Sequence, residues 1–178
     1  MDALLIIEKY YDPNSKLYNI LVNHSRSVAN KAASIISNHP ELNVDKQFVE
    51  EAAMLHDIGI FKTNAPGIEC YGTYSYICHG YLGADILCAE GYKKHALVAE
   101  RHTGTGLKSE FIIKKGLPLP DRNYCPVSLE EQLICFADIF FSKTKLGEEK
   151  SIEEVEATLS KWEDTSIIQF KEWCKLFL

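Results

Sequence analysis

The sequence predicts an all-α fold, and three observations support that prediction. Apolar residues recur at the i, i+3, i+4 spacing of amphipathic helices along almost the whole chain. Stretches with the alternating pattern of a half-buried β-strand are scarce. Helix-breaking pairs such as Asp12-Pro13, His39-Pro40 and Pro66-Gly67 fall between the periodic segments. A chain of 178 residues has the length of one domain, so we expect a single bundle of about seven to eight helices across residues 1–178.

Seven segments carry the helical spacing, and the breakers set their limits. In chain order they are 15–38, 45–57, 79–90, 92–102, 107–115, 128–143 and 151–176. The first ten residues favour a further short helix. We expect a core over about residues 15–143, followed by a C-terminal helix at 151–176. The tract from Ile68 to Ile77 is consistent with a short strand or hairpin and equally with a loop.

Three of these helices begin at residues that are suited to capping. Asp45 is one such N-cap, because its carboxylate can accept a hydrogen bond from a free N–H of the first turn. Ser128 is followed three residues later by Glu131, and Ser151 by Glu154. Both pairs match a capping box, which predicts that helices start directly after the two serines.

Composition and net charge limit the classes of partner. The chain is 46% hydrophobic and carries 25 acidic against 19 basic residues, a net charge of −6, which argues against wrapping a long nucleic acid. No segment approaches the roughly 18 to 20 apolar residues that span a bilayer, and the run Ala3–Ile7 is too short for a secretion signal. Six cysteines without a C-x-x-C pair favour a reduced, cytoplasmic protein. We expect a monomer or a homodimer with no membrane partner.

The charge is distributed unevenly along the chain. Residues 91–123 hold seven lysines and arginines against three acidic residues, whereas 148–164 hold seven acidic residues against two lysines. The acidic run from Glu148 to Glu156 is typical of a solvated helix start. We expect Arg101 to be exposed on its helix. The basic stretch favours a compact phosphate ester as the ligand.

Imidazoles and carboxylates interrupt the apolar helix faces at several separate places. A single one is most simply a hydrogen-bonded core residue, but a lone buried carboxylate is costly unless it is paired or bound to a cation. Several such groups that converge are readily satisfied by sharing metal ions, and a set without thiolates indicates Mn, Fe, Co, Ni, Zn or Mg. The candidate metal ligands are His24, His56, Asp57, His79, His102 and Asp138.

The order of these residues resembles that of a known family. His24, the segment Leu55-His56-Asp57-Ile58-Gly59, and Asp138 after Ala137 form an H…HD…D pattern. This pattern resembles the HD-domain metal-dependent phosphohydrolases, of which HDIG is the commonest local form. The likeness extends over about residues 15–143 and implies an all-α fold.

The resemblance also implies a metal centre with one or two divalent ions. In the family, residues matching His24, His56, Asp57 and Asp138 bind one ion. His79 and His102 stand where dinuclear members have further ligands, and the carboxylate matching Asp57 then bridges the two ions. Asp57 and His56 are accordingly the expected catalytic residues.

The implied activity is hydrolysis of a small phosphorylated metabolite, a nucleotide or a dinucleotide, by a metal-activated water. Lys143, Thr103, Gly104 and Lys62 are the candidate substrate-binding residues, although Lys62 stands two positions after the place where many HDIG proteins have lysine. The tyrosines at 71, 74 and 76 are suited either to stacking on a nucleobase or to packing within the fold.

Two functions other than hydrolysis are consistent with the same ligand pattern. One alternative is a metal-stabilised module that senses a nucleotide without turnover, and a weaker one is a di-iron oxygenase. The sequence contains neither a G-x-x-x-x-G-K-[ST] loop nor a G-x-S-x-G elbow. The cyclic dinucleotide phosphodiesterase branch is disfavoured, because it has two adjacent histidines and a Gly-Tyr-Pro motif, whereas Gly91-Tyr92 is followed here by Lys93.

Overall fold

The computed structural model describes residues 1–161 and 164–178, and over these residues the fold is helical, as the sequence predicts. The α-helices are α1 (Ala3–Ile7), α2 (Lys16–Asn38), α3 (Lys46–Leu55), α4 (His79–Ala89), α5 (Lys93–Arg101), α6 (Ser109–Lys115), α7 (Leu129–Ile139), α8 (Ile152–Leu159) and α9 (Asp164–Phe177). Single 3₁₀ turns lie at Pro40–Leu42, Ile60–Lys62, Pro66–Ile68 and Tyr76–Cys78. Within the described residues, no helix is both long enough and apolar enough to cross a membrane.

The predicted caps form, with one difference. Asp45 accepts a hydrogen bond from Phe48 N at 3.0 Å, and Ser151 and Glu154 form a reciprocal capping box. Ser128 accepts from the N–H of Glu131 at 3.1 Å. The Glu131 carboxylate, however, accepts from the backbone N–H of Val127 at 2.9 Å, one residue before the N-cap. The carboxylate of Glu131 therefore does not close a capping box with Ser128, and it also forms an ion pair with Arg101.

Helix α7 ends at Ile139, so the prediction of a helix to residue 143 is wrong by one turn. The cause lies in a residue beyond the helix. Lys150 donates a hydrogen bond from its backbone N–H to Phe140 O and another from Nζ to Ile139 O, each at 2.9 Å. These bonds satisfy carbonyls that a longer helix would have used internally. The chain after Phe141 therefore leaves the helix axis and forms a turn at 142–145.

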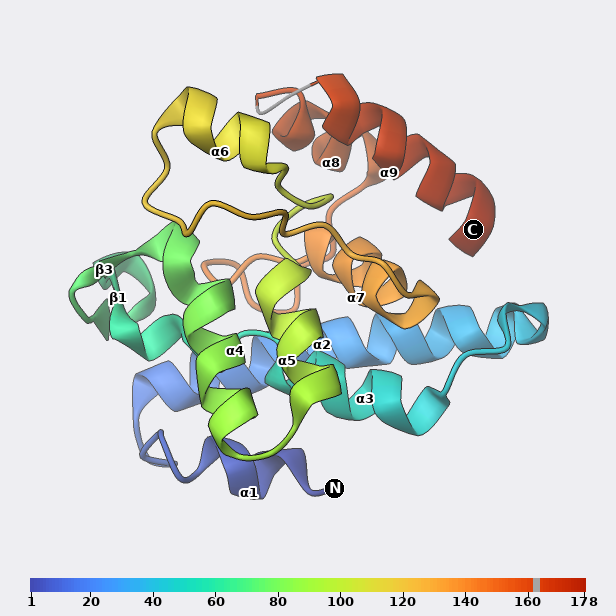
Figure 1. The fold of residues 1–178 in the computed structure, drawn as a ribbon. Coiled ribbons are helices and arrows are strands. Elements are labelled where there is room, and N and C mark those ends of the chain that lie inside the picture. Colours follow the sequence, from blue (N-terminus) through green and yellow to red (C-terminus); the bar gives the residue numbers. More distant parts are fainter. Residues whose placement is uncertain (162–163) are drawn as a thin grey trace.

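The predicted single helix at 151–176 is two helices, α8 and α9, and residues 162–163 between them lie outside the described residues. The Ser160 side chain donates a hydrogen bond to Ala157 O at 3.0 Å where α8 ends. The break allows α8 to bury Val155 and Leu159 while α9 buries Phe170 in the same apolar cluster. In Figure 1 the two helices lie beside each other at the top of the molecule.

A small sheet follows the 3₁₀ turn after α3. It consists of β1 (Thr63–Ala65), β2 (Cys70–Tyr71) and β3 (Tyr74–Ser75) in the order β2-β1-β3. β1 pairs antiparallel with β2, through Asn64 and Tyr71, and parallel with β3, through Thr63 and Tyr74. The tract 68–77 thus contains strand, which is one of the structures that its sequence allows. Its two strands pair with β1 rather than with each other, so it is not a hairpin.

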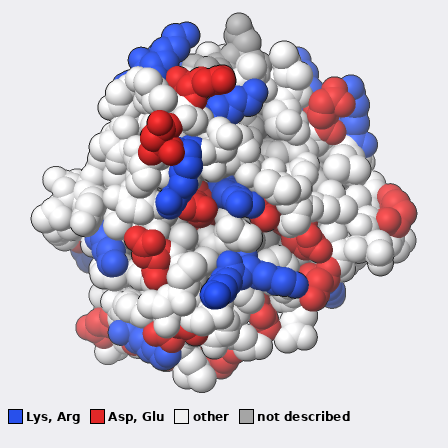
Figure 2. Space-filling view, in the orientation of Figure 1, with Lys and Arg blue, Asp and Glu red and all other residues white. Residues whose placement is uncertain are grey.

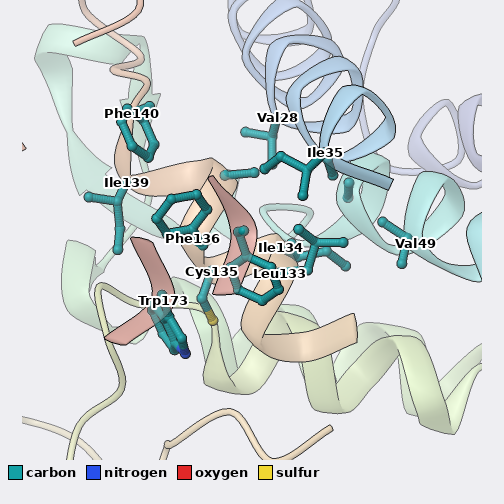
Figure 3. Close-up of a cluster of buried hydrophobic side chains, with 14 of the residues drawn as sticks. Val28, Ile35, Val49, Leu133, Ile134, Cys135, Phe136, Ile139, Phe140 and Trp173 are labelled. Atoms are coloured by element: carbon teal, nitrogen blue, oxygen red, sulfur yellow. The ribbon is translucent and has the colours of Figure 1, made fainter. Parts of the chain in front are cut away.

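The largest apolar cluster joins α2, α3 and α7 to the C-terminal helices. Figure 3 shows Phe136 and Ile134 of α7 facing Val28 and Ile35 of α2, with Trp173 of α9 closing one side. A second cluster packs α1 against α2, α3, α4 and α5. Five helices therefore pack together in the middle of the molecule, namely α2, α3, α4, α5 and α7 (Figure 1). Part of the buried face of each helix points into this region.

Two glycines allow the close approach of α4 to its neighbours. A Cβ atom at Gly59 would lie 2.3 Å from His79 O, and one at Gly80 would lie 2.8 Å from Ala99 O. Both distances are below normal van der Waals contact, so any side chain would push α4 away. The glycine of the HDIG segment thereby brings the start of α4, with His79, beside the His56-Asp57 pair.

Candidate metal centre

Four of the predicted ligands form one compact cluster. His24 comes from α2, His56 caps α3, Asp57 follows it, and Asp138 comes from α7. The Nε2 atom of His24 lies 2.9 Å from Asp138 Oδ1 and 3.2 Å from Asp57 Oδ2. The Nε2 atom of His56 lies 3.0 Å from Asp57 Oδ2 and 3.4 Å from Asp138 Oδ1. All four donor atoms lie within 4.8 Å of one another.

These spacings suit a divalent cation. Metal–nitrogen and metal–oxygen bonds of about 2.1 Å place neighbouring donors about 3.0 Å apart at right angles and about 3.4 Å apart at tetrahedral angles. The four histidine–carboxylate distances given above, 2.9 to 3.4 Å, lie close to this range. The arrangement therefore has the dimensions of a coordination shell.

A second cluster shares the carboxylate of Asp57. Its Oδ1 atom lies 3.4 Å from Nε2 of His79 and 3.5 Å from Nε2 of His102, and the two histidine nitrogens are 3.0 Å apart. Asp57 thus presents Oδ2 to the first cluster and Oδ1 to the second. A carboxylate in this position can bridge two cations.

The hydrogen bonds of three histidines leave Nε2 free to act as a ligand. The Nδ1 atoms of His56, His79 and His102 lie 2.6, 2.6 and 2.8 Å from the backbone carbonyls of the residues three positions earlier. A carbonyl only accepts, so each Nδ1 carries the proton and each Nε2 of a neutral ring carries a lone pair. Metal-ligating histidines are commonly oriented in this way.

The contact between His79 and His102 also favours a cation. With both Nδ1 atoms donating to carbonyls, the two Nε2 lone pairs face each other at 3.0 Å. A shared proton would relieve the repulsion, but burial and the neighbouring His102 lower the pKa of His79 to about 3. A metal ion bound to both nitrogens and to Asp57 satisfies the same atoms without requiring a charged imidazole.

The electrostatic field of the first cluster attracts positive charge. Burial alone opposes ionisation of Asp57, yet Lys143 and His56 hold the pKa of its carboxyl well below the usual range. Burial lowers the pKa of His56, but the charge of Asp57 and the bond to Asp138 outweigh it and raise that pKa to about 10. A site that holds a proton so firmly also favours a metal cation in its place.

Several ligand atoms are buried without an adequate partner. Among the described residues, Asp57 Oδ1 and the Nε2 atoms of His24 and His56 make no hydrogen bond of normal geometry. His24, His56 and Asp57 are at most 2% exposed, so water does not compensate. Buried polar groups in this state cost stability unless a cation coordinates them. The residues present therefore fit a divalent metal centre.

Lys143 joins this centre, although it lies beyond the end of α7. Its Nζ atom is 2.5 Å from Asp57 Oδ2, and its side chain is 11% exposed. Burial lowers the pKa of the ammonium, but Asp57 outweighs this effect and raises it above its usual value. The ring of Tyr76 lies 5.9 Å from the same Nζ and stacks on His79 at 4.6 Å. The structure thus places a fixed positive charge directly beside the two clusters.

A cavity of about 310 Å³ borders the centre, and Asp138 is the one member of the two ligand clusters among its lining residues. Thr103 and Gly104, which follow His102, line it together with Tyr76. Lys62 is not among the lining residues: its Nζ atom lies over the ring of Phe61, 6.0 Å from the centroid. Of the three candidate tyrosines, Tyr71 and Tyr74 are exposed, whereas Tyr76 lines the cavity beside the centre.

Sequence reasoning missed two features near the centre. The sequence predicts an exposed Arg101, and this prediction is wrong. The Nη1 atom of Arg101 lies 3.1 Å from Oε2 of the buried Glu131. This ion pair joins the end of α5, next to His102, to the start of α7. Lys150 lines the cavity although it belongs to an acidic run that looks solvated. The sequence signal for a distinct role of Lys150 is that it is the one lysine within the acidic run from Glu148 to Glu156.

The Arg101–Glu131 pair yields a testable prediction. We expect Glu131→Gln to lower the free energy of unfolding by about 2 kcal/mol, because the charged hydrogen bonds to Arg101 and Val127 weaken in a buried place. Urea denaturation measures the change. The matched control is Glu130→Gln, whose carboxylate makes only a 3.5 Å contact with Asp45 N. Equal stability of the two variants would show that the ion pair contributes nothing.

Comparison with known proteins agrees with the geometry. The model of the HD-domain family matches residues 21–142, a range that includes all six predicted ligands and ends before Lys143. No solved structure matches the chain.

Three archaeal relatives align with most of this chain. A tRNA (cytidine(56)-2'-O)-methyltransferase of Thermoplasma volcanium is 38% identical over 126 residues, which cover 70% of this chain and 32% of that protein. The protein of the same name from Picrophilus torridus is 32% identical over 129 residues, 72% of this chain and 33% of that protein. An uncharacterised protein of Methanocaldococcus jannaschii is 38% identical over 120 residues, 66% of this chain and 63% of that protein.

The chain thus spans about a third of the two methyltransferases and less than two thirds of the third relative. What it shares with the family model is the part of the fold that carries the H…HD…D residues. The match of residues 21–142 and the convergence of His24, His56, Asp57 and Asp138 show that this chain belongs to the HD-domain family.

Proposed function

We propose that the protein is a metal-dependent phosphohydrolase that acts on a small phosphorylated metabolite, with a nucleotide or a dinucleotide as the leading classes. The observation that carries this proposal is the position of Asp57, whose two oxygens face two separate sets of ligands. His24, His56, Asp57 and Asp138 would hold one divalent ion, and Asp57, His79 and His102 a second. Mn, Fe, Co, Ni, Zn and Mg all suit such N/O donors.

Two divalent ions held by these residues would supply a Lewis-acidic centre that activates water near neutral pH and offsets the charge of a phosphoryl group. The protein groups around them orient the ester. Asp138 borders the cavity, so phosphorus can approach from that side. Lys143 is not among the residues that line the cavity, but its positive charge lies 2.5 Å from Asp57 Oδ2 and is suited to a phosphoryl oxygen bound at the centre.

Thr103 and Gly104 complete the phosphate side of the proposed site. Both residues line the cavity directly after His102, where α5 has ended. The Thr103 hydroxyl and the local backbone N–H groups are donors for phosphoryl oxygens. His56 and Asp57 are the proposed catalytic residues, because both would bind the metal ions directly.

The methyl transfer in the names of two relatives is not proposed for this chain. The matched segment covers about a third of each of those proteins, and the residues it brings together are an HD-type ligand set. On the face drawn in Figure 2, Lys and Arg are intermixed with Asp and Glu among the described residues. Because the chain as a whole carries a net charge of −6, a long nucleic acid stays outside the proposed substrate class, and RNA enters the test as a competing substrate.

The test restores metals one at a time to protein that has been stripped with a chelator. Phosphate release and product chromatography are measured for mononucleotides, dinucleoside polyphosphates, sugar phosphates and a short RNA. We expect no turnover without metal and metal-dependent hydrolysis of a small ester. Tight nucleotide binding without turnover under every metal would identify a sensor. Oxygen consumption by the reduced-iron protein would identify an oxygenase.

A further inference from the structure

The cavity beside the metal centre has two chemically different parts. Asp138, Tyr76 and Thr103 line it beside the ligand clusters, because Tyr76 stacks on His79 and Thr103 follows His102. The apolar part of its lining consists of Leu107, Phe111, Ile139, Phe141 and Leu159. A ligand that fills this cavity with its phosphate at Asp138 therefore places its other part against hydrocarbon.

Part of this wall lies outside the segment that matches the HD family. Thr158 and Leu159 of α8 and Ser166 of α9 line the cavity, whereas the family match ends at residue 142. Lys150, which ties the end of α7 to the start of α8 through Ile139 O, lines it as well. The C-terminal helix pair thus adds a side wall that the metal-binding helices do not provide.

We propose that this cavity is a specificity pocket for the apolar, ring-sized body of a phosphate monoester, and that α8 and α9 form its selective wall. The inference rests on the proposed function, since the phosphate must lie at the metal centre. Aromatic walls favour a flat ring: Phe111 and Phe141 both line the cavity, and Tyr76 lines it beside the ligand clusters.

The volume of the cavity limits the size of that body. At about 310 Å³ it lies at the lower end of the roughly 300–1,000 Å³ typical of small-molecule pockets. One phosphorylated ring compound fits such a space, whereas a dinucleotide carries a second nucleoside that would remain outside. Within the proposed function, the pocket therefore favours a monoester with one ring system over a dinucleotide.

The experiment compares two phosphonates, which present the same head group and resist hydrolysis because their C–P bond is not an ester. Isothermal titration of the manganese-loaded full chain measures the affinities of methylphosphonate and phenylphosphonate. We expect phenylphosphonate to bind about 10-fold more tightly or better, since its ring leaves water for an apolar wall. Equal affinities in the wild-type protein would overturn the pocket and leave the proposed function intact.

Two variants test which residues cause the preference for phenylphosphonate. Ser166→Phe places a ring at a half-buried position of α9 that lines the cavity, and we expect it to abolish the preference for phenylphosphonate over methylphosphonate. Phe111→Leu removes an aromatic wall with little change in apolar character, and we expect it to reduce the preference. The matched control is Glu172→Phe, an exposed position on the same helix, which should keep the wild-type ratio.

The outcomes separate this inference from the proposed function. Loss of the preference in Ser166→Phe, with Glu172→Phe unchanged, supports a wall formed by α9. An unchanged preference in both Ser166→Phe and Phe111→Leu would place the ring elsewhere and overturn the inference. A protein that binds neither phosphonate with any metal would contradict the phosphoryl site itself, and the proposed function would fall with it.

Discussion

Asp57→Asn is expected to cause the largest loss of any single substitution in this protein. We expect the variant to retain neither ion and to lose phosphate release by about 10³-fold or more, because one carboxylate serves both ligand clusters. Asparagine has the same shape but lacks the charge and one of the two ligand oxygens. Elemental analysis and phosphate release on the same sample measure both effects.

His102→Gln is the matched comparison for this prediction. His102 belongs only to the second cluster, so this variant should keep one ion in the first cluster while losing the other. Circular dichroism establishes that both variants are folded. An Asp57→Asn protein with two ions and full turnover would refute the bridging role, and with it the proposed mechanism.

Lys143→Met is expected to have the second largest effect, a fall in phosphate release of about 10²-fold with the ion content unchanged. Methionine keeps much of the apolar stem of lysine but removes the charge that lies 2.5 Å from Asp57 Oδ2. If Lys143 contacts the phosphoryl group, its loss raises the barrier to hydrolysis without removing a metal ligand. Steady-state kinetics and elemental analysis separate these two effects.

Lys145→Met provides the control for Lys143. It lies in the same turn, but its side chain is 72% exposed and forms an ion pair with the exposed Glu148 at 3.7 Å. We expect this variant to behave as the wild type does. Equal rates for Lys143→Met and the wild type would assign Lys143 a purely structural role, because the buried charge would then contribute nothing to hydrolysis.

The helices and the convergence of the candidate ligands could be predicted because their signals are local. His24 interrupts the apolar stripe of α2, and Asp138 interrupts that of α7, so burial of each stripe directs a polar group inward. The His56-Asp57 pair ends an apolar helix in the same way. Helix packing then brings these groups together, as the sequence predicts.

The features that escaped prediction depend on contacts between distant segments. Lys143 is a candidate substrate-binding residue from the sequence, but its contact with Asp57 escaped prediction. That contact requires α7 to end at Ile139, where Lys150 bonds to the last carbonyl. Arg101 looks exposed on its own helix and is paired only because α7 presents Glu131 across the interface. The cavity wall from α8 and α9 likewise requires a helix break that the apolar periodicity of 151–176 does not reveal.

If Asp57 joins two metal ions in one centre, elemental analysis of the purified chain after metal loading and dialysis will show it. We expect two divalent ions per wild-type chain, one in His102→Gln and close to none in Asp57→Asn. A wild-type chain that retains no ion, or an Asp57→Asn chain that retains as many as the wild type, would contradict the bridging role of Asp57.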